Sequence, residues 1–438
     1  MERPIVMINK TKVFISVFFI YAIIYLSGLS LNADPSFYLI TLGLCFFTTL
    51  MLLIDKEIVN PISILFPFVL GSYYYQFMLS DEQIVLSSNT VLSIFLFIFS
   101  YVLGVGFVLY NKTLMKTKKM PEHDFINTYY IDAVFVFSIL IFFIECVVTG
   151  GFPFFIALIH KINIYEDMFF IPVLHYLVML SSIFPAIYYF QYKRGKVTKL
   201  KFYVFTLISL FVLVNIMSRQ VFILSVVFFF FVYAKSNKIS PNRYILKVSL
   251  FSAFMFLLLG FVRIQSINNS VSQLEYLKAY AQVPSSRDVN TFDVTFNLYT
   301  SQNLVTLDEM VNNIEEAGFG FGKYTIQALI KTFKYDSTFD LRFPVEFDSF
   351  KRLGTIIADP YLDFGFFGVF LFAFIYGVLN SMIFMKAKYS SSVRYTLFWA
   401  MICYVMLMSV FTNFFNVLFT WIVFLFVFSI TYGQSVKK

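Results

Sequence analysis

Charged residues are scarce in this chain: they make up 13% of its 438 residues, whereas hydrophobic residues make up 59%. A soluble protein of this length needs more polar residues to cover its surface, so the composition excludes a soluble globular protein. Cysteine is also scarce, and Cys45, Cys146 and Cys403 all lie in apolar segments. We therefore expect buried free thiols, and neither a disulfide framework nor a cysteine metal cluster.

The sequence also lacks the motifs of nucleotide chemistry. It contains no Asp-x-Asp pair, which would hold a metal-bound nucleotide sugar. The stretch GFGFGK (318–323) lacks the spacing and the following serine or threonine of a phosphate-binding loop. The triplet DFG (363–365) is not accompanied by the Gly-rich loop and catalytic loop of a kinase. These stretches therefore do not indicate a nucleotide-binding enzyme.

Long apolar segments dominate the sequence. Several exceed the roughly 18 uncharged residues that indicate a membrane-spanning helix. The first has no Ala-x-Ala-like cleavage site, so we interpret it as a retained helix rather than a signal peptide. The sequence therefore predicts an all-α polytopic membrane protein with about twelve transmembrane helices. The predicted spans are 13–31, 36–54, 61–79, 90–110, 130–149, 171–190, 202–217, 220–234, 245–262, 361–385, 395–411 and 414–432.

Lysine and arginine gather in the connections on one side of these spans. Apart from one long segment, the connections on the other side hold only Lys161 and Arg219. The positive-inside rule then predicts that both termini are cytoplasmic. The net charge of +8 reflects this topology and does not indicate nucleic-acid binding. The basic connections are 111–129, 191–201, 235–244 and 386–394.

One large extramembrane segment, 263–360, is predicted to lie outside. It divides the chain into a bundle of about nine transmembrane helices (1–262), an extracytoplasmic cap (263–360) and a bundle of about three (361–438). Apolar residues recur at helical spacing in 272–282 and 323–333, so the cap should be partly helical.

Arg219 is the first candidate site residue. It lies in the turn NIMSRQ between the spans 202–217 and 220–234, each of which gives roughly 21–24 Å of helix against a hydrocarbon core of about 30 Å. The turn should therefore be recessed, and a charge at that depth is costly unless it is paired or binds an anion. Alternatively, Arg219 snorkels or pairs with a carboxylate such as Asp363.

Other charged residues are candidates at the predicted outer face. Arg263 ends the ninth span and could equally be an interfacial anchor, while Arg342 and Arg352 approach the tenth span along the chain. Converging guanidinium groups suit a diphosphate, because planar forks bind its oxygens in pairs. Asp363 follows Tyr361 in the first turn of the tenth span, where a helix N-terminus favours negative charge. The sequence leaves two roles open for Asp363: a catalytic group, or a carboxylate that simply starts the helix.

Three further ionisable residues have alternative explanations. His160 lies in an outer connection and His175 one turn into the sixth span, and either is a base or a buried, hydrogen-bonded histidine. Glu145 is one of the few charges inside a predicted span.

Four stretches carry a family resemblance: MSRQ (217–220), GFVRIQS (260–266), FNLYTSQNLVTLDEM (296–310) with GFGFGKYTIQAL (318–329), and YLDFGFFGVFLF (361–372). Together they resemble the Wzy-type oligosaccharide repeat-unit polymerases, also called O-antigen polymerases. The last is the most specific, because these polymerases commonly show Tyr-x-Asp-Phe-Gly-x-x-Gly where the helix after the large loop begins. The motifs cover roughly 200–385, and the N-terminal half matches in hydropathy only.

The resemblance implies a GT-C-like, metal-independent glycosyltransferase of the bacterial cytoplasmic (inner) membrane, with no cofactor. It implies polymerisation of undecaprenyl-diphosphate-linked oligosaccharides, with arginines holding the diphosphate. That role transfers to Arg219 and Arg263, and more weakly to Arg342 and Arg352. We also expect Asp363 to act in catalysis, and Tyr361 and His160 to contact substrate. Implied partners are the lipid-linked oligosaccharide, membrane lipids, a chain-length regulator and a flippase, but no nucleic acid.

Two other functions would produce a similar sequence. A glycan ligase of the O-antigen ligase type would also have many spans, a large outer loop and outward-facing arginines. A lipid-linked oligosaccharide flippase or other transporter predicts charges deep in several helices and little mass outside the membrane. The large segment 263–360 favours the enzymes over the transporter.

Overall fold

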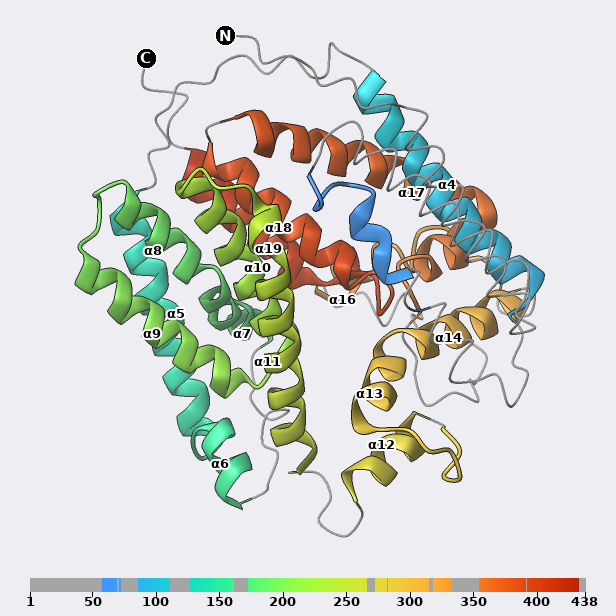
Figure 1. Cartoon of the computed structure of the whole chain (residues 1–438), viewed down its shortest axis with the longest axis horizontal. Coiled ribbons are helices and arrows are strands. Elements are labelled where there is room, and N and C mark those ends of the chain that lie inside the picture. Colours follow the sequence, from blue (N-terminus) through green and yellow to red (C-terminus); the bar gives the residue numbers. More distant parts are fainter. Residues whose placement is uncertain are drawn as a thin grey trace. The chain divides into compact units, whose positions relative to one another are not determined.

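The computed structural model describes residues 57–68, 71, 86–110, 127–160, 172–265, 272–281, 283–314, 318–332, 354–390 and 392–432. Within these ranges every regular element is a helix and there is no β-strand (Figure 1). The prediction of an all-α fold is therefore confirmed for the described part of the chain. The α-helices are α4 (Ser88–Tyr110), α5 (Thr128–Val148), α6 (Pro153–His160), α7 (Pro172–Met179), α8 (Phe184–Lys193), α9 (Lys199–Ile216), α10 (Arg219–Ser236), α11 (Ile245–Gln265), α12 (Gln273–Tyr280), α13 (Thr291–Tyr299), α14 (Ser301–Asn312), α16 (Gln327–Thr332), α17 (Ala358–Tyr389), α18 (Val393–Leu407) and α19 (Leu418–Tyr432). The 3-10 turns are η1 (Ser63–Leu65), η3 (Leu180–Ser182), η4 (Pro241–Arg243) and η6 (Phe414–Asn416).

Several helices have the length and composition of membrane spans. Five helical stretches are long and apolar enough to cross a membrane: Ser88–Val108, Thr128–His160, Lys199–Ile216, Arg219–Ser236 and Ala358–Tyr389. The apolar helices α18 and α19 are shorter, with 15 residues each. A multi-pass membrane protein is therefore supported. The predicted spans 13–31 and 36–54 lie outside the described residues, so the count of twelve stays a prediction.

The predicted span 171–190 is not one continuous helix. Helix α7 ends at Met179, η3 follows, and α8 begins at Phe184. Pro185 occupies the first turn of α8. Its ring would clash with the carbonyl of Ser181 in an uninterrupted helix, and it has no N–H to donate, so the helix breaks before it.

The described helices belong to two compact units. Unit 1 comprises Met1–Met115, Thr295–Met382 and Met406–Asn416, and unit 2 comprises Lys116–Val294, Ile383–Val405 and Val417–Lys438. These limits do not coincide with the boundaries predicted at 262 and 360, because α14 and α16, which lie in the predicted cap, belong to the same unit as α4 and most of α17. The division into two bundles and a cap stays a prediction about topology.

In unit 1, α4 and α17 approach each other closely. A methyl group on Gly104 would lie 2.3 Å from the carbonyl oxygen of Phe374, and one on Gly377 would lie 2.1 Å from that of Tyr101. The amide of Asn380 also donates to the Tyr101 hydroxyl at 3.0 Å. Small residues allow this backbone contact between apolar helices, as they do within membranes. The crossing fixes α17, whose first turns carry Tyr361 and Asp363.

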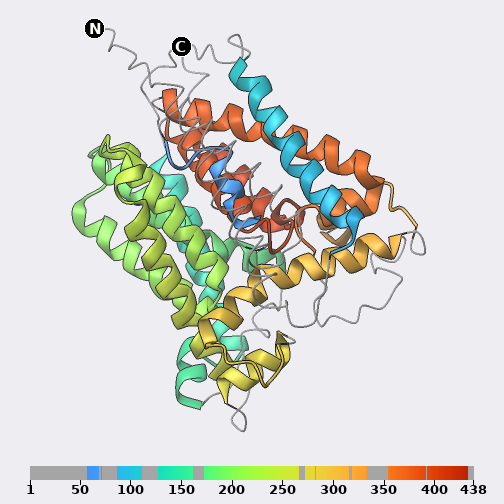
Figure 2. The same cartoon turned by 45° about the vertical axis from the view of Figure 1, so that its right-hand side comes forward.

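In unit 2, α8 packs against both α9 and α10, and α10 packs against α11 (Figures 1 and 2). Aromatic rings fill much of the space between the helices. Phe135 of α5 stacks on Phe205 of α9 with ring centroids 4.5 Å apart, and Tyr188 of α8 meets Phe205 edge to face at 4.9 Å. Such pairs stabilise helix packing beyond the area that they bury.

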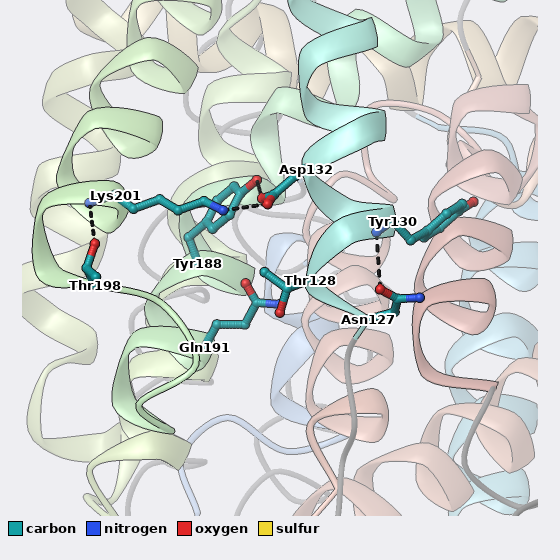
Figure 3. Close-up of polar contacts among 8 residues, drawn as sticks. All are labelled: Asn127, Thr128, Tyr130, Asp132, Tyr188, Gln191, Thr198 and Lys201. Atoms are coloured by element: carbon teal, nitrogen blue, oxygen red, sulfur yellow. Dashed lines mark hydrogen bonds and ion pairs between the residues drawn. The ribbon is translucent and has the colours of Figure 1, made fainter.

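Polar contacts hold one end of unit 2 together (Figure 3). The carboxylate of Asp132 accepts a hydrogen bond from the Tyr188 hydroxyl at 2.8 Å and pairs with the ammonium group of Lys201. Nearby, the amide of Gln191 donates to the Thr128 hydroxyl at 3.3 Å. These bonds join the start of α5, the end of α8 and the start of α9.

Hydrogen bonds from two further residues lie at the same end. Asn237, just beyond α10, donates to the hydroxyl of Tyr189 at 2.7 Å. Lys235 donates to the carbonyls of Ala387 and Ser390, at 2.8 and 2.5 Å, and so satisfies carbonyls at the end of α17. The described parts of the four connections predicted to be cytoplasmic therefore meet at one end of unit 2, as a single orientation requires. Which side of a membrane this end faces stays a prediction.

Candidate functional site

The candidate site in unit 2 begins with the turn between α9 and α10. Helix α9 ends at Ile216, and Met217 adopts a left-handed conformation with φ 53°, which terminates the helix. Ser218 is the N-cap of α10, and its hydroxyl accepts from the Val221 amide at 3.5 Å. The predicted hairpin is therefore present. Each arm has 18 residues, or about 27 Å of helix.

Arg219 is the first residue of α10. Its guanidinium carbon lies 5.0 Å from the centroid of the Phe256 ring on α11, a cation–π contact, and the side chain is half-buried. A positive side chain at a helix N-terminus opposes the helix dipole. The positive guanidinium and the N-terminal amides of α10 together make this end of the hairpin suited to an anion.

Glu145 of α5 and His175 of α7 form a buried pair. Nδ1 of His175 lies 3.0 and 3.1 Å from the two carboxylate oxygens of Glu145, and the His175 and Glu145 side chains are 0% and 6% exposed, respectively. The pairing compensates part of the desolvation cost of two ionisable groups. Burial at this level in an apolar bundle is uncommon without a structural or functional reason.

The Glu145–His175 pair lies at the same end of unit 2 as Arg219. Cys146, Val178 and Met217, which are close neighbours of these three residues along the chain, belong to one buried apolar cluster. This end is opposite the lysine-rich connections, because α5 and α9 each run from one end to the other. The structure therefore gathers three ionisable residues at the end of unit 2 that the sequence predicts to face outward.

Asp363, the candidate carboxylate of unit 1, is 0% exposed. Its Oδ1 accepts from the amide of Tyr324 at 3.1 Å. Its Oδ2 accepts from the amide and from the hydroxyl of Thr325, at 2.7 and 2.6 Å. Three donors fully enclose the carboxylate, so the geometry supports a positioning role. A direct catalytic role stays a prediction.

The loop 318–326 rests on a break in α17. Phe364 and Gly365 are non-helical, and Gly365 has φ 60° and ψ −145°, a combination that only glycine adopts easily. The break frees the carbonyls of Leu362 and Asp363, which accept from the amides of Gly320 and Phe321 at 2.9 and 3.2 Å. The glycine-rich loop thus binds the carboxylate of Asp363 and the carbonyls of Leu362 and Asp363.

The other predicted site residues are placed as follows. Tyr361 is 5% exposed, and its ring packs edge to face on Phe366 at 5.4 Å. His160 is exposed at the end of α6. Arg263 lies in α11, where only its backbone is described, and Arg342 and Arg352 lie outside the described residues.

The structure does not bring all the predicted residues to one place. Arg219 belongs to unit 2, whereas Tyr361 and Asp363 belong to unit 1. Sequence reasoning missed the pairing of Glu145 with His175. A usable signal was present, because the two ionisable residues lie at matching depths in consecutive antiparallel spans.

Comparisons with protein-family models, with curated proteins and with solved structures found no match to this chain.

Proposed function

We propose that this protein is a metal-independent glycosyltransferase that polymerises undecaprenyl-diphosphate-linked oligosaccharide repeat units on the outer face of the bacterial cytoplasmic membrane. The observation that carries the proposal is the position of Arg219. Its guanidinium is held over Phe256 at the N-terminus of α10, at the end of unit 2 opposite the lysine-rich connections. With both termini cytoplasmic, that end faces outward.

Arg219 binds the diphosphate of the lipid carrier in this mechanism. A guanidinium fork donates two parallel hydrogen bonds to phosphate oxygens, and the first amides of α10 point toward the same region. Both are fixed before the reaction, so they stabilise the charge that develops on the leaving diphosphate without reorganising. Arg263, with Arg342 and Arg352 of the outer segment, supplies further positive charge.

The reaction itself is a substitution at the anomeric carbon of the donor sugar. A hydroxyl oxygen of the acceptor glycan forms a bond to this carbon while the bond to the phosphate oxygen breaks. The diphosphate leaves with the bonding electrons, and the hydroxyl proton passes to a base or to water. Because the leaving group is already activated, the hydroxyl needs little base assistance.

The large outer segment holds the glycan, and the apolar helices accommodate the polyprenyl chains among membrane lipids. His160, which is exposed at the end of α6, is the proposed substrate contact outside the diphosphate, whereas the ring of Tyr361 is buried against Phe366. Asp363 fixes the loop 318–326 through Tyr324 and Thr325. A flippase supplies the lipid-linked units, and a chain-length regulator is the second proposed partner.

A transporter of lipid-linked oligosaccharides is the alternative that one observation favours. The buried Glu145–His175 pair is a titratable pair inside an apolar bundle, as a proton-coupled carrier would need. A glycan ligase is the other alternative, and it would use the same diphosphate-binding arginine.

The lipid-linked glycan that accumulates when the gene is deleted separates the three functions. A polymerase deletion leaves single repeat units on the lipid carrier, accessible from outside the cell. A ligase deletion instead accumulates long lipid-linked chains, and a flippase deletion leaves single repeats accessible only from the cytoplasm. Single external repeats are the expected result, and either of the other two patterns overturns the proposal.

A further inference from the structure

The loop 318–326 of unit 1 displays large apolar side chains. Phe319 and Phe321 are 48% and 81% exposed, and Ile326 is 49% exposed. A single exposed apolar residue on a protein surface is ordinary, but three within nine residues form a patch. Burial of such side chains away from water is favourable, so the patch indicates a contact with another apolar surface.

Hydrogen bonds to α17 fix the loop, so the exposure of its rings does not come from a loose chain. The amide of Gly320 donates to the carbonyl of Leu362 at 2.9 Å. The amide of Phe321 donates to the carbonyl of Asp363 at 3.2 Å. The carboxylate of Asp363 holds the following turn of the loop through three more hydrogen bonds. The loop therefore presents its apolar side chains from a defined backbone.

Phe321 has a strained backbone conformation. Among the described residues, three that are not glycine have a positive φ: Met217, Lys238 and Phe321. Met217 and Lys238 lie at the ends of α9 and α10, where a left-handed residue terminates a helix. Phe321, with φ 51°, follows no described helix end, and a bulky residue is strained at this φ where glycine is not. Strain at an exposed phenylalanine suggests that its ring has a function.

The exposed face of α17 shows what surrounds this part of unit 1. Ala358–Tyr389 is long and apolar enough to cross a membrane. Exposed apolar residues recur at every fourth position along it, a spacing that places them on one side of the helix. They are Phe367, Leu371, Ile375 and Leu379. An exposed apolar stripe on a helix of this length faces lipid.

The loop joins this stripe where α17 begins. A methyl group on Gly365 would lie 3.3 Å from the ring of Phe319, and one on Gly322 would lie 3.9 Å from the ring of Phe364. Phe364 is itself 38% exposed and precedes Phe367 by three residues. The exposed rings of the loop therefore continue the lipid-facing stripe of α17.

Lys323 adds a positive charge to the loop. Its ammonium nitrogen lies 4.7 Å from the centroid of the Tyr324 ring, and the side chain is half-buried. A lysine among apolar side chains is typical of a membrane interface, where the rings enter the acyl region while the ammonium group reaches lipid phosphates.

We propose that the loop 318–326 is an anchor that inserts into the membrane interface. Phe319 and Phe321 enter the lipid leaflet at the N-terminal end of α17, and Lys323 binds the phosphate of a phospholipid. In the predicted orientation this is the outer leaflet, so part of the predicted cap rests in the bilayer surface rather than in water. The anchor requires only a membrane protein, and it stands apart from the proposed glycosyltransferase function.

Spin labels on single cysteines test the anchor in the full-length protein. Its three natural cysteines are replaced, and the protein is reconstituted in bilayers of phosphatidylethanolamine and phosphatidylglycerol. Phe321→Cys carries the test label, Phe367→Cys is the lipid reference, and Ser285→Cys is the reference in the predicted outer segment. Oxygen concentrates in lipid whereas a water-soluble nickel chelate does not, so the ratio of their collisions with the label reports its surroundings.

The anchor predicts a ratio of oxygen to nickel collisions that is several-fold higher at Phe321→Cys than at Ser285→Cys and close to that at Phe367→Cys. A ratio at Phe321→Cys like that at Ser285→Cys would place the loop in water and overturn the anchor. Few collisions with either reagent would show that protein covers the loop, and this result also overturns it.

Thermal unfolding in the same bilayers gives a second test. If the ring of Phe321 contacts lipid rather than protein, the midpoint of Phe321→Ala should stay within about 2 °C of that of wild type. Phe97→Ala is the comparison, because Phe97 of α4 is 0% exposed and its removal leaves a cavity that lowers the midpoint further. A fall beyond this margin in Phe321→Ala would show that the ring packs against protein, which contradicts the anchor.

Discussion

The carboxylate of Asp363 accepts hydrogen bonds from both the amide and the hydroxyl of Thr325, at 2.7 and 2.6 Å, across 38 residues of chain. This contact joins the glycine-rich loop 318–326 to the broken first turns of α17. The buried carboxylate of Asp363 is tolerated at the start of this apolar helix because both of its oxygens accept hydrogen bonds.

Replacing Asp363 with asparagine should destabilise the protein. Either orientation of the new amide turns an NH2 group toward a donor, Tyr324 on one side or Thr325 on the other, and the lost bonds to a charged group cost about 1.5–3 kcal/mol. Thermal unfolding can be followed with a thiol-reactive dye, because Cys146 and Cys403 are buried free thiols. An Asp363→Asn midpoint equal to that of wild type would show that the three bonds do not hold the loop.

Gly365→Ala should lower the midpoint temperature of thermal unfolding. At φ 60° and ψ −145° an L-residue is strained by about 1–3 kcal/mol, and the added methyl group would approach Phe319 at 3.3 Å. Gly106→Ala in α4 is the matched control, because nothing lies within 4 Å of its added methyl group. Equal midpoints for the two variants contradict the strained break in α17.

Arg219→Ala should abolish polymer formation and leave the protein in the membrane at normal abundance. Removing a fixed donor to a developing anion costs about a hundredfold or more in rate, and Arg219→Lys should recover only part of it because an ammonium group has no planar fork. Arg243→Ala is the control, since Arg243 is exposed in a connection predicted to be cytoplasmic. Polymer is measured by gel electrophoresis of cell extracts, and a normal ladder from Arg219→Ala removes Arg219 from the site.

Glu145→Ala should be strongly destabilising, by about 3–5 kcal/mol, because His175 would lose its buried partner. The double variant Glu145→Leu/His175→Leu should recover much of this loss, since no ionisable group of the pair then remains buried. Dye-monitored unfolding gives both midpoints. If the double variant is stable and still makes polymer, the pair is structural. If it is stable but no longer exports glycan, the transporter gains support.

The predicted orientation can be tested with single cysteines in a cysteine-free background. A membrane-impermeant maleimide applied to intact cells should label Ser285→Cys in the outer segment and should not label Ser240→Cys beyond α10. Both positions are exposed, so accessibility within the fold does not decide the outcome. The reverse labelling pattern would place the lysine-rich connections outside.

Much of the helical architecture could be predicted because apolar runs report membrane-length helices directly. The spans 202–217 and 220–234 locate the α9–α10 turn to within one residue of its observed position, since Arg219 interrupts an otherwise apolar stretch. The break in the predicted span 171–190 had a local signal, Pro185, that was outweighed by hydropathy.

Contacts between distant parts of the chain were harder to predict. The partners of Asp363 are 38 and 39 residues away, and nothing near Asp363 specifies them. Asn413 and Asn416 likewise meet α17 only through the packing of unit 1. Hydropathy gives the elements, but the register of their packing decides which polar groups meet.

Reconstitution of the purified protein in liposomes with native undecaprenyl-diphosphate-linked repeat units tests the central claim most directly. Products are resolved on gels with and without EDTA, for wild type and Arg219→Ala. The account predicts a ladder of polymer that survives EDTA and disappears with Arg219→Ala. The absence of a ladder with this native substrate, with repeat units instead moved unchanged across the bilayer or finished polymer transferred to another acceptor, would contradict it.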